Sequence, residues 1–419
     1  MANKNKTHND GQSVGKVDSP ITPSIVGLGY PLVDLLSATI TPSSFGLVSG
    51  ETVLATSSAA YCDLFSQLVH SQDTKIIAGG STLNSIRILQ WLFSTIAFEN
   101  AAAFIGCVGN DKYYHLLQSA MLSDFVIPIL EVAQVEEMSD EMTCDSDNDN
   151  KEILSTGTSG VLISPSTGER TLVTFLGASK YLFQSFVQSK EPWKVLTNCR
   201  WVFSCGFMCQ SSAPEHYQIA SLVAKMSSLK VGNCGFAMNV GAPYICRNFT
   251  KQLFSLLFLS DIIFANKDEA FALAEAAGWM SLSTTLEEIA IKIAELRDET
   301  ETESTMVYKT RRIVALTCGK DPTVCALFDL STSPCAISFS IPIHPDDIVP
   351  NEKIVDLTGA GDAFAAGFMA HIIKSINPHI YTSDCILNAT RIGHWAASRV
   401  VRSQGATWVK DEGKKCPFL

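Results

Sequence analysis

Short apolar runs alternate with longer segments of helical periodicity along most of the chain, from about residue 24 onward. Residues 103–109, 261–266 and 313–317 are apolar runs too short for a buried helix, so they predict strands. Between such runs, apolar side chains recur at helical spacing, as in residues 86–92. This alternation predicts the α/β class, with a mostly parallel sheet that has helices on both faces.

Four stretches depart from the alternation. Residues 36–58, rich in serine, threonine and small apolar residues, and the hairpin-like residues 160–175 are expected to form a small appended sheet. Residues 1–21 are polar and predict a disordered tail. Residues 131–152 are acidic, lack apolar periodicity and lack the central glycine of a calcium loop, so they predict a solvated, mobile insertion. The rest is expected to be one domain over residues 22–419.

Composition narrows the function classes. A formal net charge of −11 argues against a general binder of nucleic acid or of membrane surfaces. The chain has 13 cysteines but no Cys-x-x-Cys pair, which favours reduced, buried thiols over a zinc site. The N-terminus has no apolar core of a secretory signal, and the most apolar stretch, residues 253–259, is too short to span a bilayer. We therefore expect a protein of the cytoplasm, with the nucleus as a second compatible compartment.

The strongest chemical signal lies in residues 354–368. A short β-type run, Ile354-Val355, is followed by a turn of small residues at 358–361 and then by an apolar helical pattern. Free amides and the positive end of a helix dipole make such a turn an anion site, and Asp362 lies directly in it. A carboxylate beside an anion site suits phosphoryl transfer to an alcohol. The turn alone is equally compatible with a tight junction in which the aspartate is an N-cap.

Candidate ligand residues occur at two earlier places. Asp34 follows the first predicted strand, where ligands bind in α/β sheets, although a solvated loop residue would look the same. The pair Gly79-Gly80 allows close approach of a ligand to the backbone, and Ser81 or Thr82 can cap the helix that follows. Asn84 would then lie in the first turn of that helix, pointing toward the ligand. No Gly-x-Gly-x-x-Gly follows the first strand, which excludes a Rossmann dehydrogenase.

Two further features have a functional and a structural interpretation. Asn266 and Glu269 are spaced i and i+3 at the end of a predicted strand, which suits metal-water or phosphate contacts but also a helix-capping pair. Arg170 leaves the predicted hairpin and could contact a phosphate, although a lone arginine there is more often solvated.

Six blocks in series resemble the motifs of the ribokinase (PfkB) family of sugar and nucleoside kinases, and most closely the branch that phosphorylates adenosine. The resemblance covers roughly residues 24–410 and leaves the tail and the acidic insertion outside. It implies a doubly wound, ribokinase-like α/β fold with a small β-sheet lid formed by segments at about 36–58 and 126–182. It also implies ATP as co-substrate and Mg²⁺ as cofactor. The blocks are residues 29–34, 78–85, 239–244, 261–270, 354–368 and 392–398.

The resemblance assigns roles to individual residues. Asp362 would take the proton of the 5′-hydroxyl, and Asp34 would accept two hydrogen bonds from the ribose diol. Arg170 would close over the phosphate. Asn266 and Glu269 would hold Mg²⁺ through water. The expected site comprises the catalytic residues Asp362, Gly359, Ala360, Gly361 and Arg170, the substrate-binding residues Asp34, Gly79, Gly80, Ser81 and Asn84, and the cofactor-binding residues Asn266, Glu269, Thr317, Gly319 and His394.

Two positions depart from the family pattern on the nucleoside side. Tyr30 stands where the family usually has asparagine, and Leu83 replaces a polar residue. Base preference is therefore open, and a kinase of another nucleoside or of a free sugar remains an alternative. A non-catalytic nucleotide-binding relative is a more distant one. The expected partners are adenosine and ATP, with no nucleic acid and no membrane, and the chain is expected to be a monomer.

Overall fold

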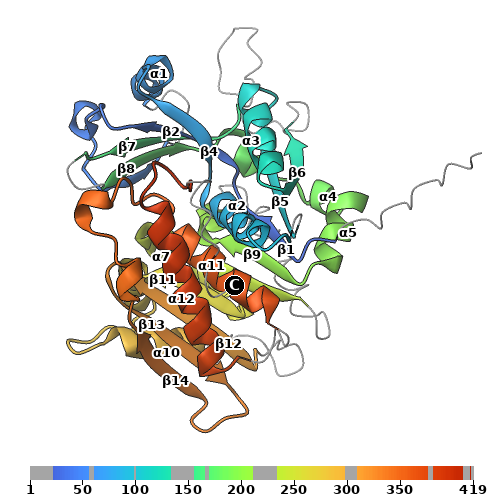
Figure 1. The fold of residues 1–419 in the computed structure, drawn as a ribbon, viewed down its shortest axis with the longest axis vertical. Helices are drawn as coiled ribbons and strands as arrows, with labels where there is room; N and C mark the ends of the chain where they lie inside the picture. The colour runs from blue at the N-terminus through green and yellow to red at the C-terminus, as the bar shows by residue number, and fades with distance from the viewer. Residues whose placement is uncertain are drawn as a thin grey trace, which may run out of the picture.

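Nine strands form one continuous sheet through the middle of the molecule in this computed structural model (Figure 1). The structure describes residues 22–55, 61–98, 101–133, 155–165, 169–210, 234–297, 309–375, 381–408 and 416. The predicted tail at 1–21 and nearly all of the acidic insertion lie outside these residues. In spatial order the strands are β14 (Ala336–Ile341), β13 (Asp321–Asp329), β12 (Arg311–Cys318), β11 (Ile262–Asn266), β10 (Gly235–Asn239), β9 (Trp201–Cys205), β1 (Ile25–Leu28), β5 (Ala102–Val108) and β6 (Val126–Val132).

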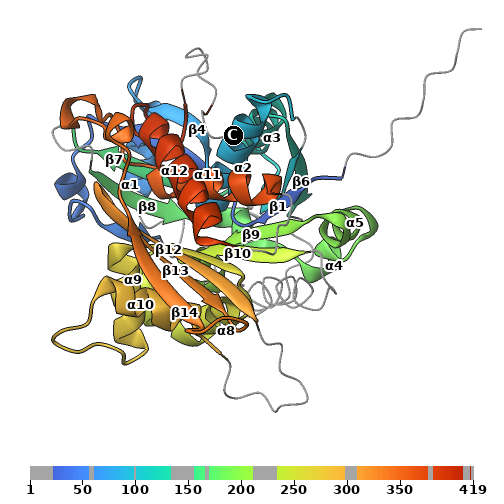
Figure 2. The ribbon, with the colours of Figure 1, turned by 60° about the horizontal axis from the view of Figure 1, so that its bottom comes forward.

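The seven strands from β12 to β6 are parallel, and β13 and β14 add an antiparallel edge. Helices cover both faces, as the sequence predicts, because successive strand residues point into opposite layers (Figure 2). One layer contains α2 (Ser81–Ser94), α3 (Lys112–Ser123), α11 (Ala360–Lys374) and α12 (Ser383–Val400). The helix α1 (Cys62–His70) instead packs on β2 (Leu32–Ser37) and β7 (Thr158–Ile163), outside the large sheet (Figure 1). The other contains α4 (Gln184–Val187), α5 (Lys190–Asn198), α7 (Pro243–Asn248), α8 (Thr250–Leu259), α9 (Lys267–Ala276) and α10 (Leu286–Ala294).

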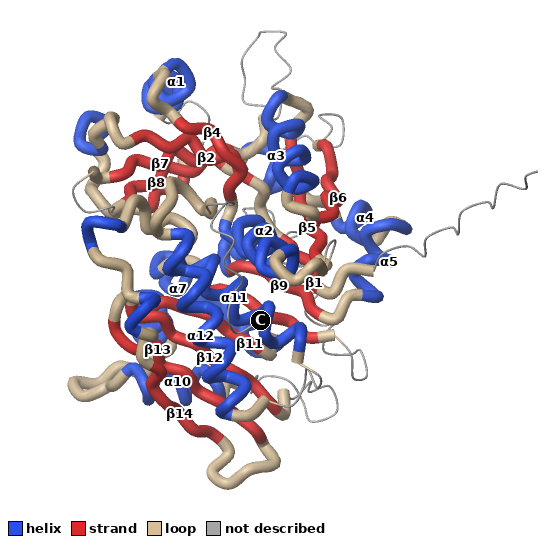
Figure 3. Tube along the Cα trace, in the orientation of Figure 1, coloured by secondary structure: helices blue, strands red, loops and turns tan. Residues whose placement is uncertain are grey.

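A second, smaller sheet lies at one end of the molecule (Figure 3). Its order is β3 (Thr52–Leu54), β8 (Arg170–Phe175), β7 (Thr158–Ile163), β2 (Leu32–Ser37) and β4 (Lys75–Gly79). The segments expected to form the lid thus contribute β3, β7 and β8, and most of β2 falls outside them. β4 joins from a segment not expected there, while β6 belongs to the large sheet because it pairs along its whole length with β5.

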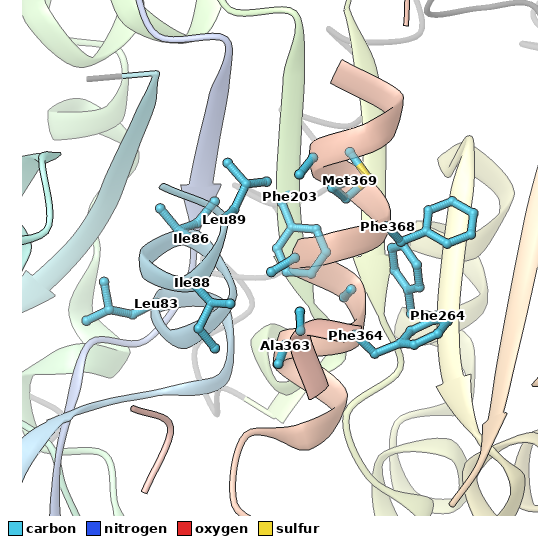
Figure 4. Close-up of a cluster of buried hydrophobic side chains, with 14 of the residues drawn as sticks. Leu83, Ile86, Ile88, Leu89, Phe203, Phe264, Ala363, Phe364, Phe368 and Met369 are labelled. Atoms are coloured by element: carbon cyan, nitrogen blue, oxygen red, sulfur yellow. The ribbon is translucent and has the colours of Figure 1, made fainter. Parts of the chain in front are cut away.

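The helices α2 and α11 pack face to face through apolar side chains (Figure 4). Ala363 and Phe368 of α11 are wholly buried, and Phe264 of β11 lies 5.3 Å, ring centroid to ring centroid, from Phe368. Burying a large apolar side chain contributes about 1.5–3 kcal/mol. The packing therefore fixes the N-terminal end of α11 relative to the end of β11 and the start of α2.

One predicted strand is absent. Ile354 and Val355 were expected to form a β-type run, but they lie in an extended segment between the 3-10 turn Asn351–Lys353 and α11. The amides of Val355 and Asp356 donate to the carbonyl of Val401, at 2.9 and 3.3 Å, rather than to a neighbouring strand. None of the helices in the described part of the chain has the length and hydropathy needed to span a bilayer.

Candidate functional site

The turn at residues 358–361 forms the start of α11, as predicted. Gly359 is the N-cap, with φ 78°, and a Cβ there would lie 2.5 Å from the Cβ of Ala406. Both the left-handed backbone and this close approach require glycine. The Ala360 amide closes the turn by donating to the Leu357 carbonyl at 3.3 Å.

Gly361, the second residue of α11, has open space beside it. Within the described part of the chain, the amides of Gly361 and Asp362 donate to no backbone carbonyl. A Cβ on Gly361 would meet no atom within 4 Å, and its backbone is not left-handed. Neither the backbone nor packing explains a glycine here, whereas a ligand approaching the two amides would.

Asp362 is a buried carboxylate held from the facing helix. Ser81 Oγ donates to its Oδ1 at 2.7 Å, and Asn84 Nδ2 donates to its Oδ2 at 3.1 Å. Burial raises the pKa of Asp362, while the bonds from Ser81 and Asn84 and the charge of Arg170 act in the opposite direction. The buried carboxylate of Asp362 therefore lies beside the open amides at the start of α11.

The start of α2 differs from the expectation that a side chain caps it. The N-cap is Gly80, with φ 99°, and no side chain among the described residues caps the helix. A Cβ at Gly80 would lie 2.3 Å from the Tyr30 carbonyl oxygen, so this position also requires glycine. The hydroxyl of Ser81, expected to contact ribose or to cap the helix, is instead bonded to Asp362.

Asp34 lies on β2 with 5% of its surface exposed. Its carboxylate rests against Gly79, where a Cβ would lie 2.2 Å from it, so Gly79 is what makes room for it. Burial raises the pKa of Asp34 to about 7, the charge of Asp362 adds to the shift, and the charge of Arg170 opposes it. The charge of Asp362 thus affects the pKa of Asp34, and Asp34 is not a solvated loop residue.

Asn266 and Glu269 form a capping box at the start of α9. The Glu269 amide donates to Asn266 Oδ1 at 2.8 Å, and Glu269 Oε2 accepts from the Asn266 amide at 2.9 Å. The capping interpretation of this pair is therefore correct, but it does not account for burial of the carboxylate to 5% exposure. Burial raises the pKa of Glu269 to about 7, which a nearby cation would reverse.

Arg170, at the start of β8, connects the small sheet to the turn. Its Nη1 donates to the Leu357 carbonyl at 2.9 Å. Its charge lowers the pKa of all three buried carboxylates, Asp34, Asp362 and Glu269.

The three residues expected on the ATP side lie around the end of β12. Thr317 is paired in register with Asn266, and Gly319 has φ 62° with no atom within 4 Å of an added Cβ. His394 of α12 is buried, with Nε2 2.8 Å from Thr323 Oγ1, and burial lowers its pKa to about 4. Its imidazole is therefore neutral near pH 7, and its Nδ1 has no partner among the described residues.

The structure adds one residue that the sequence reasoning did not single out. Asp356 is wholly buried, and its two carboxylate oxygens accept from the amides of Thr358 at 2.8 Å and Gly405 at 2.7 Å. It thereby fixes the turn to the segment that follows α12. The signal in the sequence was an aspartate two residues before the turn, a pattern typical of an Asx turn.

The two positions that depart from the family pattern are both buried. Leu83 of α2 is wholly buried in the hydrophobic core, and Tyr30 is 6% exposed. Among the described residues, no group of three or more His, Cys, Asp or Glu side chains could hold a metal ion.

Comparison with known proteins gives consistent results. A family model described as pfkB family carbohydrate kinase matches residues 143–411. The curated adenosine kinase 2 of Arabidopsis thaliana is 28% identical over 387 residues, which are 92% of this chain and 95% of the relative.

Solved structures share the architecture. The adenosine kinase of Schistosoma mansoni in complex with 2-fluoroadenosine is similar with a TM-score of 0.74 and 24% identity, over 92% of this chain and 97% of that one. The adenosine kinase of Anopheles gambiae is similar with a TM-score of 0.70 and 26% identity, over 90% and 95%. The ribokinase-like fold predicted from the sequence is confirmed.

Proposed function

The chain belongs to the pfkB family of carbohydrate kinases, and from this premise we propose that it transfers the γ-phosphoryl group of ATP to the 5′-hydroxyl of adenosine. ATP is the co-substrate that the family implies. The products are AMP and ADP. Support for adenosine over other acceptors comes from the relatives. They are named adenosine kinases, and the match with this chain covers nearly their whole length.

The observation that carries the proposal is the buried Asp362 beside the open amides at the start of α11. Asp362 accepts the proton as the 5′-oxygen attacks the γ-phosphorus, and the bond from that phosphorus to the bridging oxygen of ADP breaks. The amides of Gly361 and Asp362 and the dipole of α11 stabilise the charge on the moving phosphoryl group. Gly361 leaves the space this group needs.

The nucleoside is proposed to lie between the two sheets, with its ribose on Asp34. An ionised carboxylate suits a vicinal diol because it accepts both hydroxyl protons as hydrogen bonds. Asn84 adds a buried Oδ1 that has no partner among the described residues and can accept from a further hydroxyl. The small sheet acts as the lid that excludes water from the reaction.

A panel of acceptors tests the substrate. Adenosine, guanosine, inosine, cytidine and ribose are each incubated with ATP and Mg²⁺, and kcat/KM is measured from ADP release. We expect adenosine to give the highest kcat/KM. A higher kcat/KM for another nucleoside or for ribose would show that adenosine is not the preferred substrate. If no acceptor is phosphorylated, the chain is better explained as a non-catalytic relative.

Arg170 is proposed to neutralise the phosphoryl group while the lid is closed, because it contacts the loop before the turn and its charge lowers the pKa of the three buried carboxylates. We expect Arg170→Met to lower kcat by roughly 10–10²-fold, while the Kd of adenosine changes little. Steady-state kinetics and equilibrium binding measure the two. Arg247→Met is the control, because Arg247 of α7 forms an exposed ion pair with Glu275 of α9. Equal losses in both variants would contradict the role.

Mg²⁺ is proposed to be held through water by Asn266 and Glu269. The fit rests on the burial of the Glu269 carboxylate, whose charge calls for a nearby cation, and on the exposed Asn266 beside it. When bound, Mg²⁺ neutralises charge on the ATP phosphates.

We expect Glu269→Gln to raise the Mg²⁺ concentration for half-maximal activity by at least ~10-fold, because the amide oxygen can still accept from the Asn266 backbone amide but the charge is lost. In the parent enzyme this concentration should rise below about pH 7, where Glu269 gains a proton, and the variant should lose that dependence. Mg²⁺ titrations at several pH values measure both. Asp268→Asn, which removes an exposed carboxylate from the same helical turn, is the control. Unchanged Mg²⁺ dependence in Glu269→Gln would remove Glu269 from the metal site.

A further inference from the structure

We propose that Ser81 is a positioning residue that orients the Asp362 carboxylate for proton transfer through a direct hydrogen bond, and is not a ligand of the nucleoside. This inference rests on the proposed function, because it assigns Ser81 to the base of that reaction. Ser81 is the first residue of α2, after the left-handed Gly80. The bond from Ser81 Oγ to Asp362 Oδ1 is 2.7 Å long and joins residues 281 positions apart.

Two donors on one helical turn hold both oxygens of the carboxylate. Ser81 and Asn84 are spaced i and i+3, so their side chains share one face of α2. Ser81 bonds Oδ1 and Asn84 bonds Oδ2 of Asp362. Apolar side chains pack α2 against α11 (Figure 4). The two hydrogen bonds therefore hold the plane of the carboxylate and leave each oxygen a second lone pair for the substrate.

The two donors differ in what they can still do for a ligand. Asn84 keeps a buried Oδ1 without a partner in the described residues, so it can bind Asp362 and a hydroxyl together. Ser81 has one hydroxyl proton, and that proton is directed at Asp362. The effect of Ser81 on the reaction therefore passes through Asp362.

The charges around Asp362 explain why the base needs these donors. Burial, with the charge of Asp362 adding to it, raises the pKa of the two buried acids Asp34 and Glu269 to about 7, and the charge of Arg170 lowers the pKa of Asp362. Asp362 is buried as well, but the bond from Ser81 is the first of the influences that lower its pKa. Loss of that bond favours the protonated carboxyl, which cannot accept the substrate proton.

The test compares Ser81→Ala with Ser81→Thr, which restores a hydroxyl. Ser85→Ala is the matched control, because Ser85 lies one turn along α2 and its hydroxyl bonds the Ser81 carbonyl instead of Asp362. For Ser81→Ala we expect kcat near pH 7 to fall about 10-fold, and the acid limb of the kcat–pH profile to move to higher pH. The KM and Kd of adenosine should stay within about twofold, and Ser81→Thr should recover most of the loss.

A raised KM for adenosine with an unmoved acid limb would overturn the proposal in favour of a ribose ligand. If Ser81→Ala and Ser85→Ala lower kcat equally and neither moves the acid limb of the kcat–pH profile, the proposal is overturned, because Ser81 then acts through packing alone. The carboxyl resonance of Asp362, followed by ¹³C NMR and assigned with Asp362→Asn, should titrate at higher pH in Ser81→Ala; an unmoved titration would also overturn the proposal. A parent enzyme that makes no AMP would instead reject the proposed function, whatever the NMR titration shows.

Discussion

Replacing Asp362 with asparagine is expected to lower kcat for AMP formation by at least ~10²-fold, with binding of adenosine retained. Asparagine keeps an oxygen that can accept from Ser81, but it cannot take a proton from the 5′-hydroxyl. Asp362→Ala should lose as much kcat, because it removes the same function. Single-turnover rates give the chemical step, and calorimetry gives the Kd of adenosine.

Asp346→Asn is a suitable control for this loss. Asp346 is an exposed carboxylate on the 3-10 turn Pro345–Asp347, upstream of the loop that leads to α11. It should keep full activity. Near-normal turnover in Asp362→Asn or Asp362→Ala would remove Asp362 from its role as base.

Replacing Gly361 with alanine is expected to lower kcat by about 10²-fold while leaving the protein as stable as before or slightly more so. A Cβ at this position meets no protein atom within 4 Å, and the backbone is not left-handed. Alanine in the first turn of a helix should therefore stabilise by up to ~1 kcal/mol, because it restricts the unfolded chain. The same methyl group occupies the space before the open amides, and displacing a reacting phosphoryl group by about 1 Å can cost roughly 10²-fold in rate.

Gly278→Ala provides a control with the opposite signature. Gly278 follows α9, has φ 70° and also meets no atom within 4 Å of an added Cβ, so alanine there is strained but blocks nothing. It should lose about 1 kcal/mol of stability and keep its turnover. Thermal unfolding and kcat, measured on both variants, separate the two effects. Normal turnover in Gly361→Ala would show that the phosphoryl group does not pass in front of Gly361.

Local patterns in the sequence were sufficient for the sheet and for the turn. Strand and helix periodicity predicted the parallel sheet, because burial on both faces leaves continuous apolar runs such as that of β5. The glycines around Asp362 predicted the anion site, because their conformational freedom serves a helix N-terminus that a ligand approaches.

Features that depend on distant partners were not predictable in this way. Ser81 has the position in the sequence of a helix cap, but its hydroxyl donates a hydrogen bond to Asp362 in α11. Ile354 and Val355 have the composition of a strand, but the carbonyl of Val401 after α12 satisfies the amide of Val355. The role of Asp356 depends on Gly405, 49 residues further along the chain.

The most direct test of the central claim is the identity and stoichiometry of the product. The parent enzyme is incubated with adenosine, γ-³²P-labelled ATP and Mg²⁺, the products are separated by chromatography, and Asp362→Asn is run beside it. We predict label in adenosine 5′-monophosphate, one ADP for each AMP, and a loss of at least ~10²-fold in the variant. Label at another position of the nucleoside, ADP release without AMP, or equal rates in both proteins would contradict the account.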